Sequence, residues 1–349
     1  MKPFEGEAQG LMAYWFESPG EQDDIVISSR VRLARNFDTL YFPSMMDRSG
    51  ALEIMRTVRG VLEQAGEAYT VLSIDGLSDA DRLELVEQHL ISPALMKQAD
   101  GAVLISTDKR ISIMLNEEDH IRIQCILAGL RLKEAESSVM EVEKNLQKGI
   151  AFAFDEKLGY LTACPTNVGT GMRASVMLHL PALTATGYIT GLLKTVGEYG
   201  LTVRGLYGEG SHAVAHIYQL SNQVTLGLSE SEITDKILSS ARQIIGDERE
   251  ARRLYMASDG RVELEDKLMR SYGVAANARR LTAGEFMSLL SDIKLALSLG
   301  LIDGIEHVTL HRLLIEAQPA SIRKRAGRDL TLYERDVLRA DIVRGALRH

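Results

Sequence analysis

Short apolar runs bounded by turn residues recur along the first two thirds of the chain, and stretches with helical periodicity lie between them. Runs of this length that are rich in Val, Ile and Leu are typical of β-strands. The pattern predicts strands at residues 69–74, 101–106, 110–115, 120–127, 149–154, 174–180 and 212–222. Helices are predicted at residues 49–66, 78–90 and 132–147, and Ser78 is the expected N-cap of the second. We expect the strands to form one largely antiparallel sheet.

The pattern changes near Ser229. The β signals end there, and helical periodicity continues towards the C-terminus, with interruptions at Gly273 and near Pro319. We therefore expect an α+β fold, with an antiparallel sheet flanked by helices and a C-terminal all-helical domain. The expected boundary separates residues 1–255 from residues 256–349.

Composition narrows the class of protein. A chain of 349 residues that is 45% hydrophobic and 25% charged can bury a large core. Its net charge of -8 disfavours a general nucleic-acid binder. No window resembles a membrane span or a secretion signal, and Cys125 and Cys164 are too few for a disulfide framework. We expect a cytoplasmic protein that binds neither nucleic acid nor membranes.

Two charged clusters lie next to apolar runs of the sequence. In SSRVRLAR, residues 28–35, Arg30 and Arg32 would project from the same side of a strand and suit a polyphosphate. The alternative is a solvated basic face. NEEDHIR, residues 116–122, places three carboxylates, a histidine and an arginine between two predicted strands, which is more than a turn requires. It is a candidate site for a general base, and the alternative is an acidic turn in solvent.

Two segments combine glycines with charged residues. In CPTNVGTGMRASV, residues 164–176, Gly169 and Gly171 would let main-chain amides approach a ligand that Arg173 also faces. No Lys-Ser/Thr follows these glycines, so the segment is not a Walker A loop. VRGLYGEGSH, residues 203–212, has the composition of a loop that closes over a substrate. The alternative for residues 164–176 is an ordinary turn with an inert cysteine. The alternative for residues 203–212 is a plain hairpin loop.

Together and in this order, SSR-x-R, NEEDH followed by Ile-Arg, and CPTN followed by GTG-x-RA resemble the phosphagen kinases. These ATP:guanidino phosphotransferases include the creatine and arginine kinases. The similarity runs from about Asp24 to about Arg253. It implies a phosphagen-kinase-like catalytic domain, ATP and Mg²⁺ as cofactors, and phosphoryl transfer to a guanidinium nitrogen.

The resemblance also implies roles for individual residues. The ATP phosphates would be bound by Arg30, Arg32, Arg122, Arg173 and Arg204. Ser28, Ser29, Val31 and His89 would also lie beside the nucleotide, together with the backbones of residues 173–177 and 204–209, which include Ala174, Ser175, Val176, Met177, Gly205, Leu206, Tyr207, Gly208 and Glu209. Glu118 matches the catalytic carboxylate, with Glu117 in reserve. Glu209 matches a second glutamate that binds the acceptor, and Cys164 matches the reactive cysteine beside it.

Departures from the phosphagen-kinase pattern point to a subfamily. About twenty residues precede the motifs, where phosphagen kinases have a helical domain of roughly a hundred residues, so we expect a more open site. Met177 stands where the animal enzymes have a histidine. The helical C-terminal region resembles that of bacterial protein-arginine kinases. Arg335, Asp336 and Arg339 match most of their phosphoarginine-binding motif RDxxRP, with Ala340 in place of proline. The alternative is an amphipathic helix with both arginines on a solvated face.

This resemblance implies ATP-dependent phosphorylation of arginine side chains in proteins, which marks them for the Clp protease and inactivates a heat-shock repressor. The implied partners are protein substrates with exposed arginines, a heat-shock transcriptional repressor, a Clp ATPase, a separate activator protein and further copies of the chain in a homodimer or higher oligomer. Phosphoarginine bound at Arg335, Asp336 and Arg339 would act allosterically. Two alternatives stay open: a pseudokinase adaptor that binds phosphoarginine proteins, and a phosphagen kinase for small guanidines.

Overall fold

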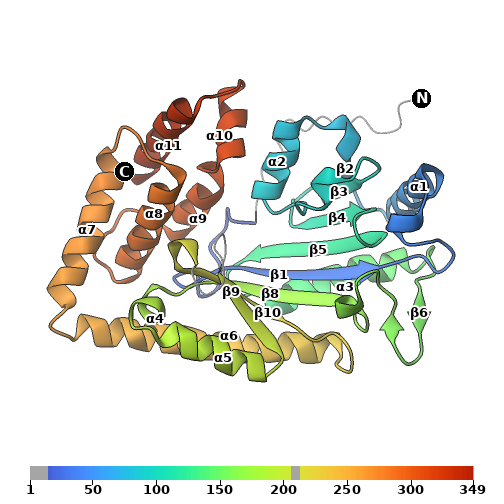
Figure 1. Cartoon of the computed structure of the whole chain (residues 1–349), viewed down its shortest axis with the longest axis horizontal. Helices are drawn as coiled ribbons and strands as arrows, with labels where there is room; N and C mark the ends of the chain where they lie inside the picture. Colours follow the sequence, from blue (N-terminus) through green and yellow to red (C-terminus); the bar gives the residue numbers. More distant parts are fainter. Residues whose placement is uncertain (1–14, 206–212, 349) are drawn as a thin grey trace.

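A computed structural model describes residues 15–205 and 213–348 of the chain. Its main feature is an eight-stranded sheet in the order β2-β3-β4-β5-β1-β8-β10-β9, in which all neighbouring strands are antiparallel (Figure 1). Its strands are β1 (Val26–Arg35), β2 (Tyr69–Ser73), β3 (Ala102–Ser106), β4 (Ile111–Leu115), β5 (Ile121–Ala128), β8 (Met172–His179), β9 (Leu201–Gly205) and β10 (Ile217–Asn222). A separate small hairpin consists of β6 (Phe154–Asp155) and β7 (Gly159–Tyr160).

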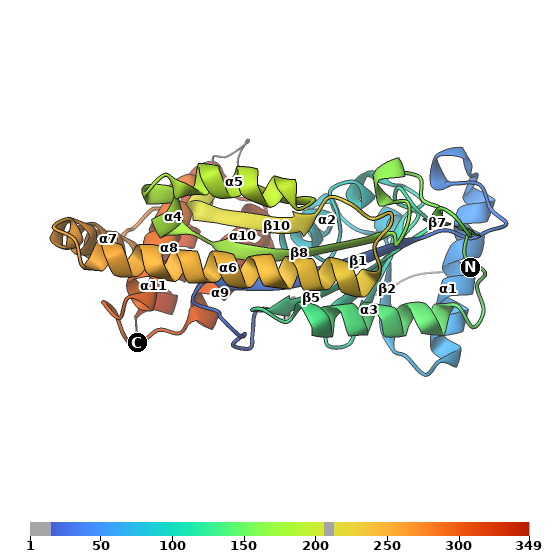
Figure 2. The ribbon, with the colours of Figure 1, turned by 90° about the horizontal axis from the view of Figure 1, so that it is seen from below.

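Helices cover one face of the sheet. Helix α3 (Leu132–Leu146) packs on β1 and β5, and α6 (Glu230–Met256) packs on β8 and β10, along the same side of the sheet (Figure 2). Helix α1 (Arg48–Gln64) packs beside α3, whereas α4 (Pro181–Ala185) and α5 (Tyr188–Glu198) lie near α6 and β9. Helix α2 (Asp79–Glu87) follows β2 along the chain. Short 3-10 turns occur at Pro43–Met45, Ile74–Gly76, Leu95–Lys97, Pro165–Asn167 and Val214–His216.

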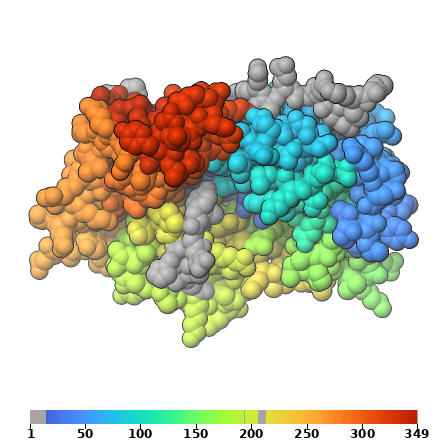
Figure 3. All heavy atoms as spheres, turned by 45° about the horizontal axis from the view of Figure 1, so that its top comes forward, coloured from blue at the N-terminus to red at the C-terminus, as the bar shows by residue number. Residues whose placement is uncertain are grey.

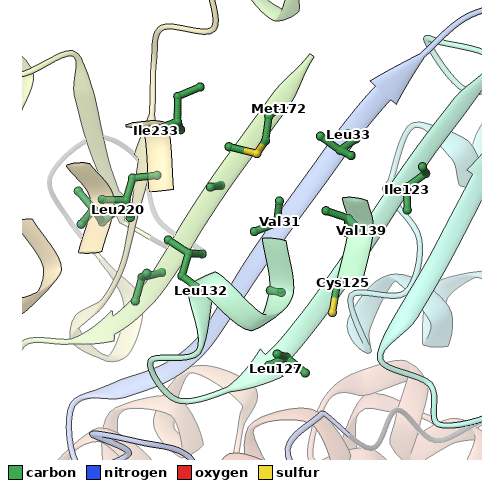
Figure 4. Close-up of a cluster of buried hydrophobic side chains, with 14 of the residues drawn as sticks. Val31, Leu33, Ile123, Cys125, Leu127, Leu132, Val139, Met172, Leu220 and Ile233 are labelled. Atoms are coloured by element: carbon green, nitrogen blue, oxygen red, sulfur yellow. The ribbon is translucent and has the colours of Figure 1, made fainter. Parts of the chain in front are cut away.

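The sheet has two different faces because side chains alternate along each strand. On the helix-covered face, apolar side chains form a continuous core (Figure 4). It includes Val31, Leu33, Ile123, Cys125, Leu127, Leu132, Val139, Met172, Leu220 and Ile233. Burial of one such aliphatic side chain contributes about 1.5–3 kcal/mol. This packing fixes the orientation of the strands, and the intervening positions point to the opposite face.

Five helices follow α6. They are α7 (Arg261–Asn277), α8 (Ala283–Ser298), α9 (His307–Glu316), α10 (Pro319–Ala326) and α11 (Leu332–Leu347). Buried residues of these helices, such as Phe286 and Ile322, form one hydrophobic cluster with Leu85 and Leu90 near α2. Helix α6 ends at Met256, next to the expected domain boundary, which stays a prediction.

The sequence pattern predicted most of these elements. The α+β class and the antiparallel sheet are confirmed, and Ser78 caps α2 by accepting a hydrogen bond from the Asp81 amide. The strand predicted at residues 149–154 is wrong: only Phe154 enters a strand, and the Ala153 amide bonds the Asn36 carbonyl in a loop. The strand predicted at 212–222 begins at Ile217, because a 3-10 turn precedes it.

Candidate active site

Five arginines share the sheet face opposite the hydrophobic core. Arg32 on β1 lies directly opposite Arg173 on β8 and Gln124 on β5. Directly opposed residues share a face, as do residues two apart on one strand. By this register, the arginine face comprises Arg30 and Arg32 on β1, Arg122 on β5, Arg173 on β8 and Arg204 on β9.

The members of the arginine face repel one another. Burial, followed by repulsion from Arg30, Arg122 and Arg173, holds the pKa of Arg32 well below its usual value. Burial, followed by repulsion from Arg204 and Arg122, also lowers the pKa of Arg173. Guanidinium groups bind phosphate oxygens through charge-assisted hydrogen bonds. A polyphosphate would therefore relieve the repulsion, and the arginine face has the charge of a polyphosphate site.

Two cavities open on the arginine face. The larger has a volume of about 340 Å³, within the usual range for ligand pockets of about 300–1,000 Å³. Its lining includes Arg30, Arg32, His89, Met114, Gln124 and Gln318. The lining of the smaller cavity includes Ser28, Arg30, His89, Ser175, Met177 and Gln219. Since Arg30 and His89 line both, the two cavities meet at the predicted nucleotide site.

His89 is held in a left-handed conformation, with φ of 60°. Its carbonyl oxygen accepts a 2.7 Å hydrogen bond from Nε2 of Gln124, on the arginine face. Burial, and then the positive charges of Arg30 and Arg32, lower the pKa of its ring to about 3. The ring is therefore neutral near pH 7 and adds no further positive charge to the site.

The pH dependence of stability tests this environment. The unfolded-state pKa of a histidine is about 6.5, so the unfolded chain takes up a proton that folded His89 does not as the pH falls from about 6.5 towards 3. This uptake destabilises the folded state. Asparagine tolerates the left-handed conformation. We expect His89→Asn to flatten the slope of unfolding free energy against pH in this window by up to about 1.4 kcal/mol per pH unit. Urea denaturation should measure the slope, and identical slopes for both proteins would contradict the assignment.

The loop between β4 and β5 carries two glutamates that differ in burial and in hydrogen-bond partners. The Glu117 side chain is 4% exposed, pairs with Arg122 at 2.6 Å and accepts a 2.8 Å hydrogen bond from the Ser92 hydroxyl. The Glu118 side chain is 45% exposed, and Nη2 of Arg122 donates to it at 3.3 Å. Glu117 is thus held by its partners, while Glu118 stands at the rim of the arginine face and is accessible to an incoming cation.

Asp119 joins this loop to the loop that carries Cys164. Its Oδ1 accepts 2.7 Å hydrogen bonds from the Asn36 side chain and from the Ala163 amide. Asn36 also donates to the Leu161 carbonyl at 3.0 Å and accepts from the His120 amide at 2.8 Å. The half-buried Cys164, whose sulfur lies 3.0 Å from the Thr166 hydroxyl, is therefore positioned relative to Glu118 by buried polar contacts.

Removing the Asp119 carboxylate should destabilise the fold. Asp119→Ala would leave buried donors on Asn36 and Ala163 without their acceptor, which costs about 1–3 kcal/mol. Chemical denaturation should detect a loss of this size. Asp266→Ala, which removes an exposed ion pair with Arg270 on one helix, is the control and should change stability by less than about 0.5 kcal/mol. Equal effects of the two substitutions would contradict the conclusion that Asp119 holds its loop to the loop that carries Cys164.

The glycines of the Gly-Thr-Gly turn serve the packing of the chain itself. A Cβ at Gly169, where φ is 115°, would lie 2.2 Å from the Thr225 carbonyl oxygen. A Cβ at Gly171, where φ is 61°, would lie 2.6 Å from the Ala34 carbonyl oxygen and the same distance from Arg35. Protein atoms thus fill the space where a side chain would be, which explains why glycine stands at both positions. The prediction that a ligand approaches the main-chain amides here stays a prediction.

Several residues predicted to contact the nucleotide point away from the arginine face. Val31, Ala174 and Val176 are buried in the core on the opposite face. The buried Ser29 hydroxyl donates to the Gly129 carbonyl at 2.8 Å. Their side chains support the sheet, so the predicted nucleotide contacts of Ala174 and Val176 are those of the backbone, and they stay predictions. Gly205 ends β9 opposite Tyr218. Leu206, Tyr207, Gly208 and Glu209 lie outside the described residues.

The C-terminal motif lies on α11. Arg339 is buried, and its guanidinium donates to the carbonyls of Ala317 and Leu281 and to Oδ1 of Asp336, at 2.8–2.9 Å. Arg339 is therefore not on a solvated helix face, so that alternative is wrong for this residue. Arg335 is only partly buried. A phosphoarginine site at the motif stays a prediction.

Sequence patterns missed some of the residues that build the site. Asn36 directly follows the arginine-rich strand, and a short amide side chain at a strand end is a usual signal of bonds to the main chain. Gln124 could have been found by extending the strand alternation from Arg122. Glu87, which also lines the larger cavity, looks in the sequence like any surface glutamate of an amphipathic helix, and nothing local distinguishes it.

The described residues also limit the kind of site. Within residues 15–205 and 213–348, no helix has the length and apolarity needed to cross a membrane. In the same ranges, no three His, Cys, Asp or Glu side chains gather as potential metal ligands. Mg²⁺ commonly binds through substrate phosphates and water with few protein ligands. An arginine face that holds phosphates fits a magnesium ion that arrives with the nucleotide.

Comparisons with known proteins agree with this geometry. Residues 52–251 match the family described as "ATP:guanido phosphotransferase, C-terminal catalytic domain". Residues 261–349 match the "Protein-arginine kinase McsB C-terminal domain". The chain is 45% identical over 339 residues to the protein-arginine kinase of Pelotomaculum thermopropionicum, covering 95% of each protein. It is 45% identical over 345 residues to that of Brevibacillus brevis, covering 97% of this chain and 96% of the relative.

Solved structures share the fold. Lombricine kinase aligns with a TM-score of 0.58 and 25% identity, covering 71% of each chain. The substrate-free duplicated taurocyamine kinase of Schistosoma mansoni aligns with a TM-score of 0.61 and 24% identity. The alignment covers 79% of this chain and 42% of that duplicated chain. The chain therefore belongs to the ATP:guanido phosphotransferase family and, within it, to the protein-arginine kinases.

Proposed function

We propose that this chain transfers the γ-phosphoryl group of ATP to the guanidinium group of arginine side chains in proteins. The observation that carries the proposal is the arginine face on β1, β5, β8 and β9, with the accessible carboxylate of Glu118 at its rim. The 45% identity to protein-arginine kinases over 95% of the chain supports a protein acceptor.

In this proposal the arginine face binds the phosphates of ATP. Phosphoryl transfer needs the phosphorus and the nucleophile held in line while negative charge is neutralised. Arg30, Arg32, Arg122, Arg173 and Arg204 would supply that charge from a rigid sheet. A bound Mg²⁺ would neutralise further charge on the phosphate oxygens. Ser28, Ser175 and Met177, which line the smaller cavity with Arg30 and His89, are the proposed nucleotide neighbours.

Glu118 is the proposed base. The acceptor guanidinium is protonated near pH 7 and its lone pair is delocalised, so it must lose a proton to act as a nucleophile. As a guanidinium nitrogen forms its bond to the γ-phosphorus, the bond from phosphorus to the bridging oxygen breaks and ADP leaves. The nitrogen's proton passes to Glu118. Glu117 suits this role less well because Arg122 and Ser92 already hold it.

Cys164 and Glu209 are the proposed companions of Glu118. Cys164 lies on the loop that Asp119 joins to the Glu118 loop, so it can orient the acceptor without bonding to phosphorus. Glu209, outside the described residues, would bind the acceptor by a charge-assisted hydrogen bond. Both roles rest on the resemblance to phosphagen kinases.

The wider role follows from the same resemblance. We propose a stress-response function in which phosphoarginine marks proteins for a Clp protease and inactivates a heat-shock repressor. Further proposals are a separate activator protein, assembly as a homodimer or higher oligomer, and allosteric binding of phosphoarginine at the α11 motif. The match of residues 261–349 to the C-terminal domain of protein-arginine kinases supports this group of proposals.

The experiment that tests the central proposal incubates the purified chain with Mg-ATP and an unfolded arginine-containing protein such as casein. Mass spectrometry under mild conditions then locates the phosphate. We expect acid-labile phosphate on arginine side chains. Transfer to free arginine or creatine but not to protein would instead indicate a small-guanidine kinase. No transfer, even with candidate activators, would indicate an adaptor.

A further inference from the structure

Helix α10 of the C-terminal region is clamped to α2, which leads into the nucleotide site. The carboxylate of Glu87, at the end of α2, accepts hydrogen bonds from the amides of Ala320 at 2.8 Å and Ser321 at 2.9 Å. The Ser321 hydroxyl donates to the same carboxylate at 3.1 Å. Glu87 therefore caps the N-terminus of α10, where a negative charge is favoured. Figure 3 shows the red C-terminal helices against the cyan segment that includes α2.

A second contact fixes the other end of this interface. Nζ of Lys324, one turn further along α10, lies 3.1 Å from Asp81 and 2.5 Å from Glu84, both on α2. Lys324 and Asp81 are partly buried and Glu84 is buried, which reduces screening by salt. With the Glu87 cap, these pairs hold the two helices in one relative position. We call the Glu87 and Lys324 contacts together the α2–α10 clamp.

The clamp lies two residues from His89. Between them, the Gln88 carbonyl accepts a 3.2 Å hydrogen bond from Nε1 of Trp15, and the His89 carbonyl accepts from Gln124. Gln124 lies directly opposite Arg32 on the arginine face. A shift at the end of α2 would therefore move His89 along the wall that both cavities share.

The C-terminal region also reaches the larger cavity itself. Gln318, directly before α10, lines that cavity together with Arg30, Arg32 and His89, and Glu87 of the clamp lines it as well. Its side-chain Nε2 donates to the Leu314 carbonyl at 2.9 Å, and the preceding Ala317 carbonyl accepts from Arg339. The turn that carries Gln318 is thus bonded on both sides, so its side chain has a defined place in the wall.

We propose that the C-terminal helical region forms part of the ATP site, with Gln318 as a nucleotide-binding residue and Glu87 as a positioning residue that acts through the α2–α10 clamp. This inference rests on the proposed function, because it takes the cavity on the arginine face as the ATP site. It predicts that the clamp governs nucleotide affinity and leaves recognition of the acceptor protein unchanged.

The test measures steady-state phosphorylation of casein and direct ATP binding for a set of variants. Glu87→Gln keeps the size of the side chain but removes its negative charge. The NH2 group of the glutamine is a donor, so it cannot accept a hydrogen bond from the N–H groups at the N-terminus of α10. We expect its KM for ATP and its ATP dissociation constant to rise about tenfold, a loss expected for a charge-assisted hydrogen bond. We expect kcat and the KM for casein to change less than about threefold. Lys324→Gln should act in the same direction, because it loosens the same clamp.

Arg325→Gln is the matched control, since Arg325 lies on α10, its side chain is 60% exposed, and it pairs with Glu316 of α9 at 3.9 Å. It should leave the KM for ATP unchanged. Gln318→Ala leaves the clamp intact and should raise the KM for ATP on its own, which keeps the proposal testable should Glu87→Gln fold poorly. An unchanged KM for ATP in Gln318→Ala would overturn the inference, as would a fall in kcat alone in Glu87→Gln. In either case, an active wild-type chain would leave the proposed function intact. A wild-type chain that binds no ATP would overturn both.

Discussion

Replacing Glu118 by glutamine should lower kcat for phosphoryl transfer to arginine by about 10²–10⁴-fold, the usual contribution of a general base. The substitution keeps the shape of the side chain but removes its ability to take the guanidinium proton. ATP affinity should change little, because Glu118 is 45% exposed at the rim and its bond to the Arg122 guanidinium is long, at 3.3 Å. Initial rates and equilibrium binding of ATP measure the two effects separately.

Glu117→Gln is the matched control for this prediction. Glu117 is buried, and it pairs at 2.6 Å with Arg122 of the arginine face. Its loss should therefore weaken ATP binding as well as transfer. If Glu117→Gln instead abolished transfer selectively and Glu118→Gln weakened both functions equally, the two roles would have to be exchanged.

Arg32→Met should produce opposite changes in ATP affinity and stability. The substitution removes a partly buried guanidinium that is repelled by Arg30, Arg122 and Arg173, and it keeps an unbranched side chain. Without nucleotide, the loss of this guanidinium relieves the repulsion among like charges. We expect the melting temperature without nucleotide to stay equal or rise, and ATP affinity to fall by at least about tenfold.

Arg59→Met provides the comparison, because Arg59 on α1 is exposed and forms an exposed ion pair with Glu63. It should change neither ATP affinity nor stability measurably. Melting curves with and without Mg-ATP give both quantities. A strongly destabilised Arg32→Met that still binds ATP normally would show that Arg32 serves the fold and not the nucleotide.

Much of this site could be predicted from alternation along strands. The spacing of Arg30 and Arg32 placed both on one face, and the register of β1 with β8 brings Arg173 beside them. The same alternation places the side chains of Val31 and Val176 in the core. Their predicted nucleotide contact is therefore left to the backbone, because side-chain roles alternate from one residue to the next.

Other features depend on contacts between distant segments. Asn36 meets Asp119 across 83 positions, and Glu87 meets Ala320 across 233. No local period encodes such pairs, because each needs the sheet and the helices to be packed first. The local pattern likewise does not separate the roles of Glu117 and Glu118, and only the resemblance favoured Glu118. The two neighbouring carboxylates differ in their packing, because Glu117 contacts Ser92 and Arg122.

The most direct test of the central claim uses two peptides that differ at one position, one with a single arginine and the other with lysine there. Both are incubated with the chain and Mg-ATP labelled in the γ-phosphate. The account predicts labelled phosphate on the guanidinium of the arginine peptide, none on the lysine peptide, and loss of the label when Glu118→Gln replaces the wild-type chain. Equal labelling of both peptides, or labelling that survives Glu118→Gln, would contradict it.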